Sequence, residues 1–171
     1  MGRSSGKLTT KTNKEVSSKM KLAEALARRA DLQKRIEQMR NRLQQSALVQ
    51  EGESPPEDPE ELLRESEGML TELEDLVGRI NRTNLEATLA DGRTLTAALA
   101  ERDALALRYG LLSGLVRMAS ERVPRYGRNE IRVLSTVDVA AKRREMDQVA
   151  VRRRDLDTRL QQANWTTDLA E

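Results

Sequence analysis

The sequence predicts a mainly α-helical protein in which long antiparallel helical hairpins form a coiled-coil-like bundle, with a small β element at one end. Charged residues make up 34% of the chain and aromatic residues only 2%, with no Phe. Apolar residues recur every three or four positions over long stretches, which is the spacing of one helix face. Segments that contain Pro or Gly interrupt these stretches and predict the turns between helices.

The composition removes several classes of chemistry. The chain has no Cys and no His, so we expect no disulfide, no thiolate or imidazole metal ligand and no imidazole base. We predict no catalytic residue, cofactor or metal site, and no enzymatic activity. No apolar run is long enough to span a membrane, and the N-terminus lacks the apolar segment of a secretory signal. We therefore expect a cytoplasmic protein.

Charge is distributed unevenly along the chain. Residues 1–19 contain five lysines and arginines against one glutamate, while the whole chain has a net charge of only +2. We expect residues 1–19 to be a disordered basic leader, because they are mostly Gly, Ser, Thr and Lys. They are either an arm for an acidic partner or a leader before a natural start at Met20. Residues 20–171 are expected to form one helical domain.

The first half of the chain predicts a helical hairpin. A first helix spans Met20–Val49, and its apolar seam contains one arginine, Arg29. The segment Gln50–Pro59 breaks the helix, because it holds three prolines and a glycine. Asp58 is then a suitable N-cap for a second helix that runs from Pro59 to about Asn84.

A small β element is expected after the second helix. Asp-Gly between short alternating segments is a hairpin signal, so we predict short strands near Ala87–Ala90 and Arg93–Leu95. A plain helix–turn–helix corner is the alternative. A third short strand is predicted over Glu130–Leu134 because of its β-branched residues.

The next helix, Ala97 to about Arg122 with Thr96 as its cap, is apolar on most sides from Leu105 onward. Such a helix is either central or lies in a subunit interface. The last helix is expected to start at Ser135, with Asp138 completing a capping box, and to end near Ala163. The residues that we predict for an oligomer interface are Leu105, Leu111, Leu112, Leu115 and Trp165.

Several polar residues lie on or beside the apolar seams. Polar residues inside a helical seam are costly unless they are paired, and they fix the register between helices. A polar layer that sets subunit pairing is the first interpretation, and an anion site is the second. The residues concerned are Arg29, Asn81, Asn84, Arg102 and Arg153.

Five segments together resemble a known bacterial family. They are LAEALARRADLQKRIEQ, INRTN, DGRTLTAALAERDAL, STVDVA and LDTRLQQANWTTDL. With these segments the chain resembles the small uncharacterised family whose members often carry the label septicolysin. The resemblance implies an α-helical, oligomeric protein, and the label implies a cytolysin. It carries over no catalytic residue.

These observations favour a non-enzymatic, self-assembling structural or interaction protein. Its expected partner is itself, as a homo-oligomer for which a hexamer is one candidate assembly. One alternative is a nucleic-acid-binding module that uses the basic leader with Arg122–Arg128 or Arg152–Arg154. A second alternative is a cytolysin, for which the apolar segment Leu105–Met118 is the candidate membrane contact. We expect neither a nucleic acid, a membrane nor a small-molecule substrate as the partner.

Overall fold

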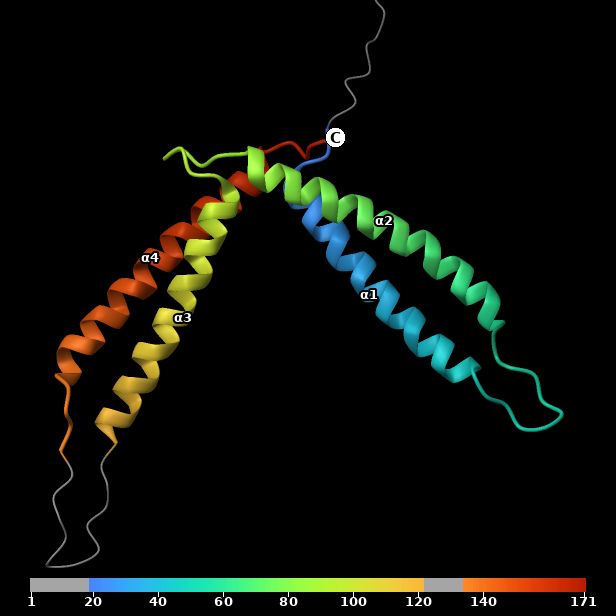
Figure 1. The fold of residues 1–171 in the computed structure, drawn as a ribbon, viewed down its shortest axis with the longest axis horizontal. Coiled ribbons are helices and arrows are strands. Elements are labelled where there is room, and N and C mark those ends of the chain that lie inside the picture. The colour runs from blue at the N-terminus through green and yellow to red at the C-terminus, as the bar shows by residue number, and fades with distance from the viewer. Residues whose placement is uncertain (1–18, 122–133) are drawn as a thin grey trace, which may run out of the picture.

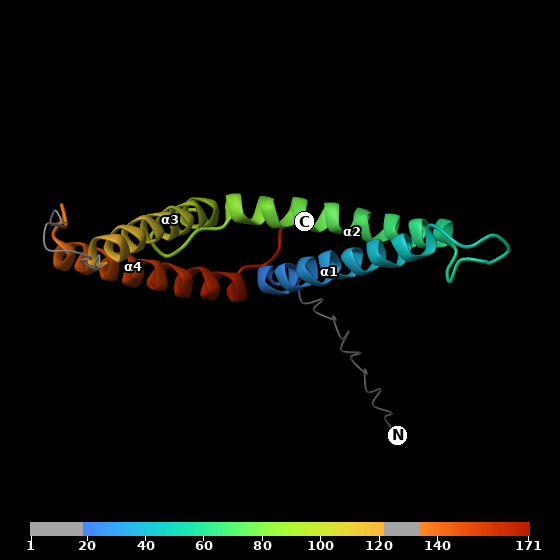
Figure 2. The same cartoon turned by 90° about the horizontal axis from the view of Figure 1, so that it is seen from below.

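The computed structural model describes residues 19–121 and 134–171, and these form two helical hairpins that meet in a V (Figure 1). The structural description includes neither residues 1–18, which make up nearly all of the predicted leader, nor the arginine-rich segment around residues 122–128. A view at right angles shows the two helices of each arm one above the other, so that the molecule is flat (Figure 2). The four helices are α1 (Leu22–Ser46), α2 (Pro59–Glu86), α3 (Leu95–Ser120) and α4 (Val139–Thr166).

The first arm is the predicted hairpin of α1 and α2. Each helix presents one apolar stripe to the other, because buried residues recur at helical spacing along both helices. Asp58 caps α2 by accepting a hydrogen bond from the Glu60 backbone N–H at 2.9 Å, as the sequence predicts. Two ion pairs, Arg28–Glu72 and Arg42–Glu57, cross between α1 and the α2 side of the hairpin. The buried apolar residues of this arm include Leu32, Met39, Leu62, Met69 and Leu76.

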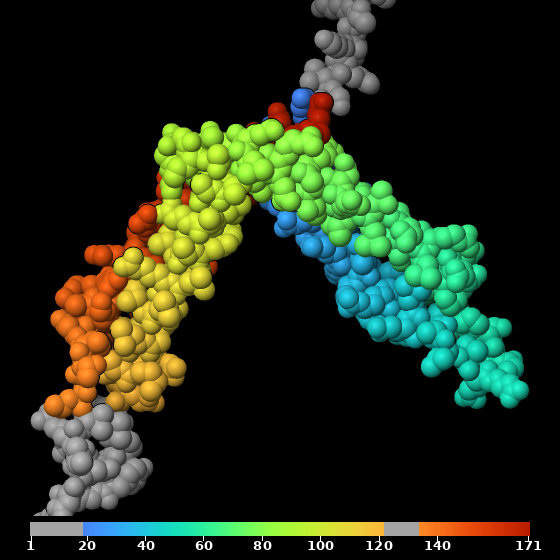
Figure 3. All heavy atoms as spheres, viewed as in Figure 1, coloured from blue at the N-terminus to red at the C-terminus, as the bar shows by residue number. Residues whose placement is uncertain are grey.

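The second arm is formed by α3 and α4, which pack along most of their length. Leu105 and Leu112 of α3 are buried, as are Val149 and Leu156 of α4. α4 ends at Thr166, three residues beyond the predicted end. The two arms are therefore separate two-helix layers, and they touch only near the apex of the V, as the space-filling view shows (Figure 3).

The C-terminal segment ties the arms together at the apex. After α4, the chain crosses to the first arm, where the Leu22 N–H donates to the Thr167 carbonyl at 3.0 Å and the Leu169 N–H donates to the Met20 carbonyl at 2.8 Å. Leu169 is only 4% exposed and belongs to the same apolar cluster as residues from all four helices. The arms are thus joined twice, by the α2–α3 link and by this C-terminal segment.

The predicted β element is wrong in the part of the chain that the structure describes. That part contains no strand, only two isolated bridges, Lys21 to Asp168 and Thr88 to Thr94. The Asp-Gly turn does form: Gly92 has a φ of +82°, and the Leu89 N–H donates to the Arg93 carbonyl at 2.8 Å. It does not extend into strands because the helices on either side take up the neighbouring residues.

The helices use these residues as their ends. The Ala87 N–H closes α2 by donating to the Thr83 carbonyl, and Thr94 already caps α3. The helical corner that we named as the alternative is therefore the observed structure. The predicted third strand, 130–134, lies almost wholly outside the described residues, and Leu134 is not in a strand.

Two predicted helix caps are also wrong. The cap of α3 is Thr94 and not Thr96, since the Thr94 side chain accepts from the Ala97 N–H at 3.2 Å. The cap of α4 is Asp138 and not Ser135, since the Asp138 carboxylate accepts from the Ala141 N–H at 2.9 Å. In each case a second good capping residue lay a few positions away, and side-chain propensity alone does not choose between them.

Candidate interaction surface

The face of α3 that points away from α4 is apolar and uncovered. Leu107 is 73% exposed, Leu111 is 77% exposed and Met118 is 58% exposed. Leu105 and Leu112, which are buried in the α3–α4 arm, lie on the other side of the helix, because each residue adds about 100° of rotation. The sequence prediction that α3 is apolar on most sides is confirmed, and in the described part of the chain only one of its two apolar faces is buried. We call the exposed face of Leu107, Leu111, Leu115 and Met118 the outer α3 face.

Two glycines flatten the outer α3 face. Gly110 and Gly114 lie between the exposed leucines, and a Cβ atom built on either would meet nothing within 4 Å. Among residues 19–121 and 134–171, no element therefore approaches the helix at these glycines. A helix surface with large side chains beside open backbone allows another helix to come close.

The five predicted interface residues lie in three different places. Leu105 and Leu112 are 7% and 8% exposed and belong to the core of the second arm, so they are not available for contact with another chain. Leu111 and Leu115 lie on the outer α3 face. Trp165 is 68% exposed at the end of α4, near the apex.

The predicted polar layer is spread over both arms. Arg29 lies on α1, and its Nε is buried without a hydrogen-bond partner in the part of the chain that the structure describes. Asn81 is exposed and Asn84 half-buried near the end of α2. In the second arm, Arg102 binds Asp103 at 2.8 Å, and Arg153 lies 3.9 Å from Asp157. Arg102 and Arg153 are thus each paired with a neighbour on their own helix.

A cluster of charged residues fastens the α2–α3 turn to the second arm. Arg93 binds both Asp91 and Glu101, Arg152 of α4 also binds Glu101, and Arg159 of α4 binds Asp91 at 3.0 Å. Hydrogen bonds from the Arg93 side chain and from its backbone N–H lower the pKa of Asp91 to about 2. The pKa of Glu101 is likewise lowered, first by Arg152 and then by Arg93. The negative charges of the carboxylates and the positive charges of the arginines thus neutralise one another, which indicates a structural role for this cluster.

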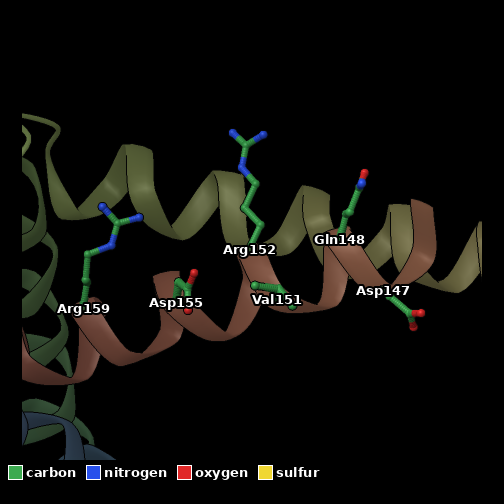
Figure 4. A pocket seen from close by; sticks show the side chains of 6 residues that line it. All are labelled: Asp147, Gln148, Val151, Arg152, Asp155 and Arg159. Atoms are coloured by element: carbon green, nitrogen blue, oxygen red, sulfur yellow. The ribbon is translucent and has the colours of Figure 1, made fainter. Parts of the chain in front are cut away.

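A shallow depression of about 400 Å³ lies on α4 beside this cluster. Its lining side chains all come from α4 (Figure 4), and its two cations, Arg152 and Arg159, are bound to acidic residues of other segments. A depression made by one helix and open to solvent does not enclose a ligand in the way that small-molecule sites do. The lining residues are Asp147, Gln148, Val151, Arg152, Asp155 and Arg159.

Sequence reasoning did not identify the residues that receive the C-terminal segment. Thr83 is 2% exposed, and its hydroxyl accepts from the Ala170 N–H at 2.9 Å while donating to the Arg79 carbonyl at 2.8 Å. The Arg79 side chain donates to the Ala170 carbonyl at 2.9 Å, and Arg82 donates to the carbonyl of Glu171. The periodicity offered one signal, because Thr83 lies three residues after the buried Ile80. The sequence prediction instead places Asn84 on the apolar seam of this helix.

Comparison with known proteins places the chain in a family. The profile of a family of unknown function (DUF6847) matches residues 29–169. The chain belongs to this family. A crystal structure of a functionally unknown conserved protein from Corynebacterium diphtheriae is similar, with 42% sequence identity and a TM-score of 0.82 over 88% of this chain and 99% of that chain. No curated protein matches.

These comparisons correct the septicolysin resemblance. Both the family and the solved relative are of unknown function, and nothing in them refers to septicolysin or to a cytolysin. The structure adds two findings for residues 19–121 and 134–171. None of the helices described there is long and apolar enough to cross a membrane. Over the same ranges, no group of three or more acidic residues is arranged to hold a metal ion.

Proposed function

We propose that this protein is a non-enzymatic interaction protein that self-associates through the outer α3 face. The observation that carries the proposal is the exposure of Leu107, Leu111 and Met118 on a single helix face. Contiguous exposed apolar surface is unfavourable in water, and on soluble proteins it marks sites of interaction. A second copy of the chain is the partner that always carries the same surface, and symmetric pairs are the commonest assemblies of soluble proteins.

The absence of an enzymatic role is part of the same proposal. The chain has no His or Cys, and the acidic residues whose pKa values are shifted are bound to arginines. Asp91, Glu101 and Glu145 each have a lowered pKa and so stay charged at neutral pH. A general acid needs the opposite shift, toward the working pH. These carboxylates serve as contacts between helices.

The test compares two leucine variants by size-exclusion chromatography with light scattering. Leu111→Glu puts a charge in the centre of the outer α3 face, where the side chain is 77% exposed in one chain. Covering Leu111 contributes about 1–2 kcal/mol per copy, so the variant should lose about 2–4 kcal/mol of association energy in a symmetric pair. We expect the variant to be monomeric under conditions in which the natural chain is associated.

Leu48→Glu is the matched control. Leu48 is 89% exposed in the α1–α2 loop and lies outside the outer α3 face. The control variant should associate as the natural chain does, and circular dichroism should show equal helix content for all three proteins. A monomeric natural chain, or equal association of both variants, contradicts the proposal.

A further inference from the structure

The outer α3 face carries a coiled-coil repeat. Its positions alternate in steps of four and three residues along α3, which keeps one seam facing a partner helix over three turns and more. The two edges of the seam differ. One edge holds Asp103, Gly110 and Arg117, and the other holds Arg108 and Leu115. The seam consists of Ala100, Ala104, Leu107, Leu111, Gly114 and Met118.

We propose that two copies pair through α3 in an antiparallel arrangement, about a two-fold axis that passes beside residues 109 and 110. This inference rests on the proposed self-association and adds its geometry. In this register Leu107 packs against the partner's Leu111, and Ala100 lies opposite the partner's Met118. The large side chain at one end of the seam thus meets the small one at the other end. A parallel pair would set Met118 against Met118 and Ala100 against Ala100, leaving one layer crowded and the other empty.

The charges on one edge of the seam are compatible with the antiparallel direction. The antiparallel register places Asp103 opposite the partner's Arg117, and the two-fold axis repeats the pair, so the edge is complementary to itself. Asp103 already binds Arg102 of its own helix through Oδ1 at 2.8 Å, but its side chain is still 68% exposed, so a second cation can reach it. In a parallel pair Asp103 would face the partner's Arg108. That arginine is already bound to Glu145 of α4 at 2.7 Å within each chain.

The glycine on this edge lies where the two helices cross. In this register Gly110 of one copy lies opposite Gly110 of the other on the same edge, and a Cβ atom built on it meets nothing within 4 Å in its own chain. A bulky residue there would hold the helices apart. The sequence thus places its smallest residue where this edge meets itself across the two-fold axis.

Disulfide trapping in mixtures tests the direction, and the chain suits it because it has no natural cysteine. Leu107→Cys and Leu111→Cys are prepared as separate full-length proteins and oxidised alone and as an equal mixture. The antiparallel register brings residue 107 next to 111 of the other copy, so disulfide-linked dimers should form about tenfold faster in the mixture than in either protein alone. Faster linking of each protein alone overturns the antiparallel arrangement.

Charge exchange tests the register independently. Asp103→Arg and Arg117→Asp each set like charges opposite one another, and each should weaken association about tenfold; the double variant should restore it. If the natural chain dimerises and each single variant associates as strongly as it does, the proposed register is overturned, but the proposed self-association is not. A natural chain that stays monomeric at every concentration overturns both.

Discussion

The hydroxyl of Thr83 should hold the two arms together through the C-terminal segment. It is 2% exposed, lies at the end of α2 and accepts the Ala170 N–H at 2.9 Å. Val has almost the same shape as Thr and fits the same buried place. Thr83→Val therefore removes the hydrogen bond to the C-terminal segment without leaving a cavity.

The size of the effect follows from the groups involved. The substitution removes the acceptor for Ala170 and also the bond from the hydroxyl to the Arg79 carbonyl at 2.8 Å. Each contributes about 0.5–1.5 kcal/mol net. Ala170 is half-buried, so water replaces part of what is lost. We expect a decrease of about 1–2 kcal/mol in the free energy of unfolding, which lowers Tm by about 3–6 °C in a chain of this size.

Thr71→Val is the matched control for this experiment. Thr71 is on the same helix, and its hydroxyl also donates to the carbonyl four residues earlier, Glu67, at 2.9 Å. It is exposed and lies twelve residues before Thr83 on α2, about three helical turns away. The control removes the same bond within the helix, so the difference between the two variants measures the contact with Ala170.

The assay is urea unfolding followed by circular dichroism at 222 nm, at the lowest workable protein concentration. Hydrogen exchange at the Ala170 amide is the second readout, and it should speed up in Thr83→Val and stay unchanged in Thr71→Val. Equal stability of the two variants together with unchanged exchange at Ala170 would refute the role of Thr83 at the apex.

Three further outcomes test other parts of the structure. The pKa of Asp91 is lowered to about 2 from the usual 3.8, so its charged form stabilises the fold fully above pH 4, and this stabilisation is lost as the pH falls through 2. The difference in free energy of unfolding between the natural chain and Asp91→Asn should therefore disappear between pH 4 and pH 2 in acid titrations. A difference that stays constant over this range would exclude the ion pairs of Asp91 as its cause. Gly92→Ala should lose about 1 kcal/mol because its φ is +82°, whereas Gly68→Ala, at an exposed helical position with open space, should gain about as much; thermal unfolding of both checks the sign. Trp165, 68% exposed near the apex, should be quenched by acrylamide equally in dilute and concentrated protein; protection that grows with concentration would move the interface from α3 to the apex.

The sequence predicts the helices of this protein better than their arrangement. Three- and four-residue spacing identifies the faces that bury Leu32, Met69 and Leu156, because helix amphipathicity is a local property of the chain. The capping of α2 by Asp58 is local in the same sense. The division into two arms is not local, since it depends on which of several similar apolar faces pair with one another.

The candidate surface shows the same limit. Because α3 is apolar on most sides, the sequence predicts that it has more apolar surface than one partner helix can bury. The exposure of Leu107, Leu111 and Met118 confirms this prediction. Periodicity could not tell which of its leucines are buried within the arm, so Leu105 and Leu112 were placed in an interface together with Leu111 and Leu115. The contact between Thr83 and Ala170 joins residues far apart in the chain. The spacing from Ile80 is compatible with a buried Thr83, but it does not identify Ala170 as the partner.

The Asp-Gly turn shows how a correct local signal leads to a wrong element. Gly92 adopts the positive φ that the dipeptide favours. The residues on either side of the turn form the ends of the two helices, because Thr94 caps α3 and the Ala87 N–H donates the last hydrogen bond of α2. A turn of this type joins strands only where the flanking residues are free to pair.

The most direct test of self-association is sedimentation equilibrium of the unmodified chain over a dilution series. The chain mass is 19.3 kDa. We expect the mass to rise with concentration from this value toward twice it, or toward a larger even multiple if the α3 pairs assemble further. A mass that stays at 19.3 kDa at every concentration, or an odd multiple, would contradict symmetric pairing through α3.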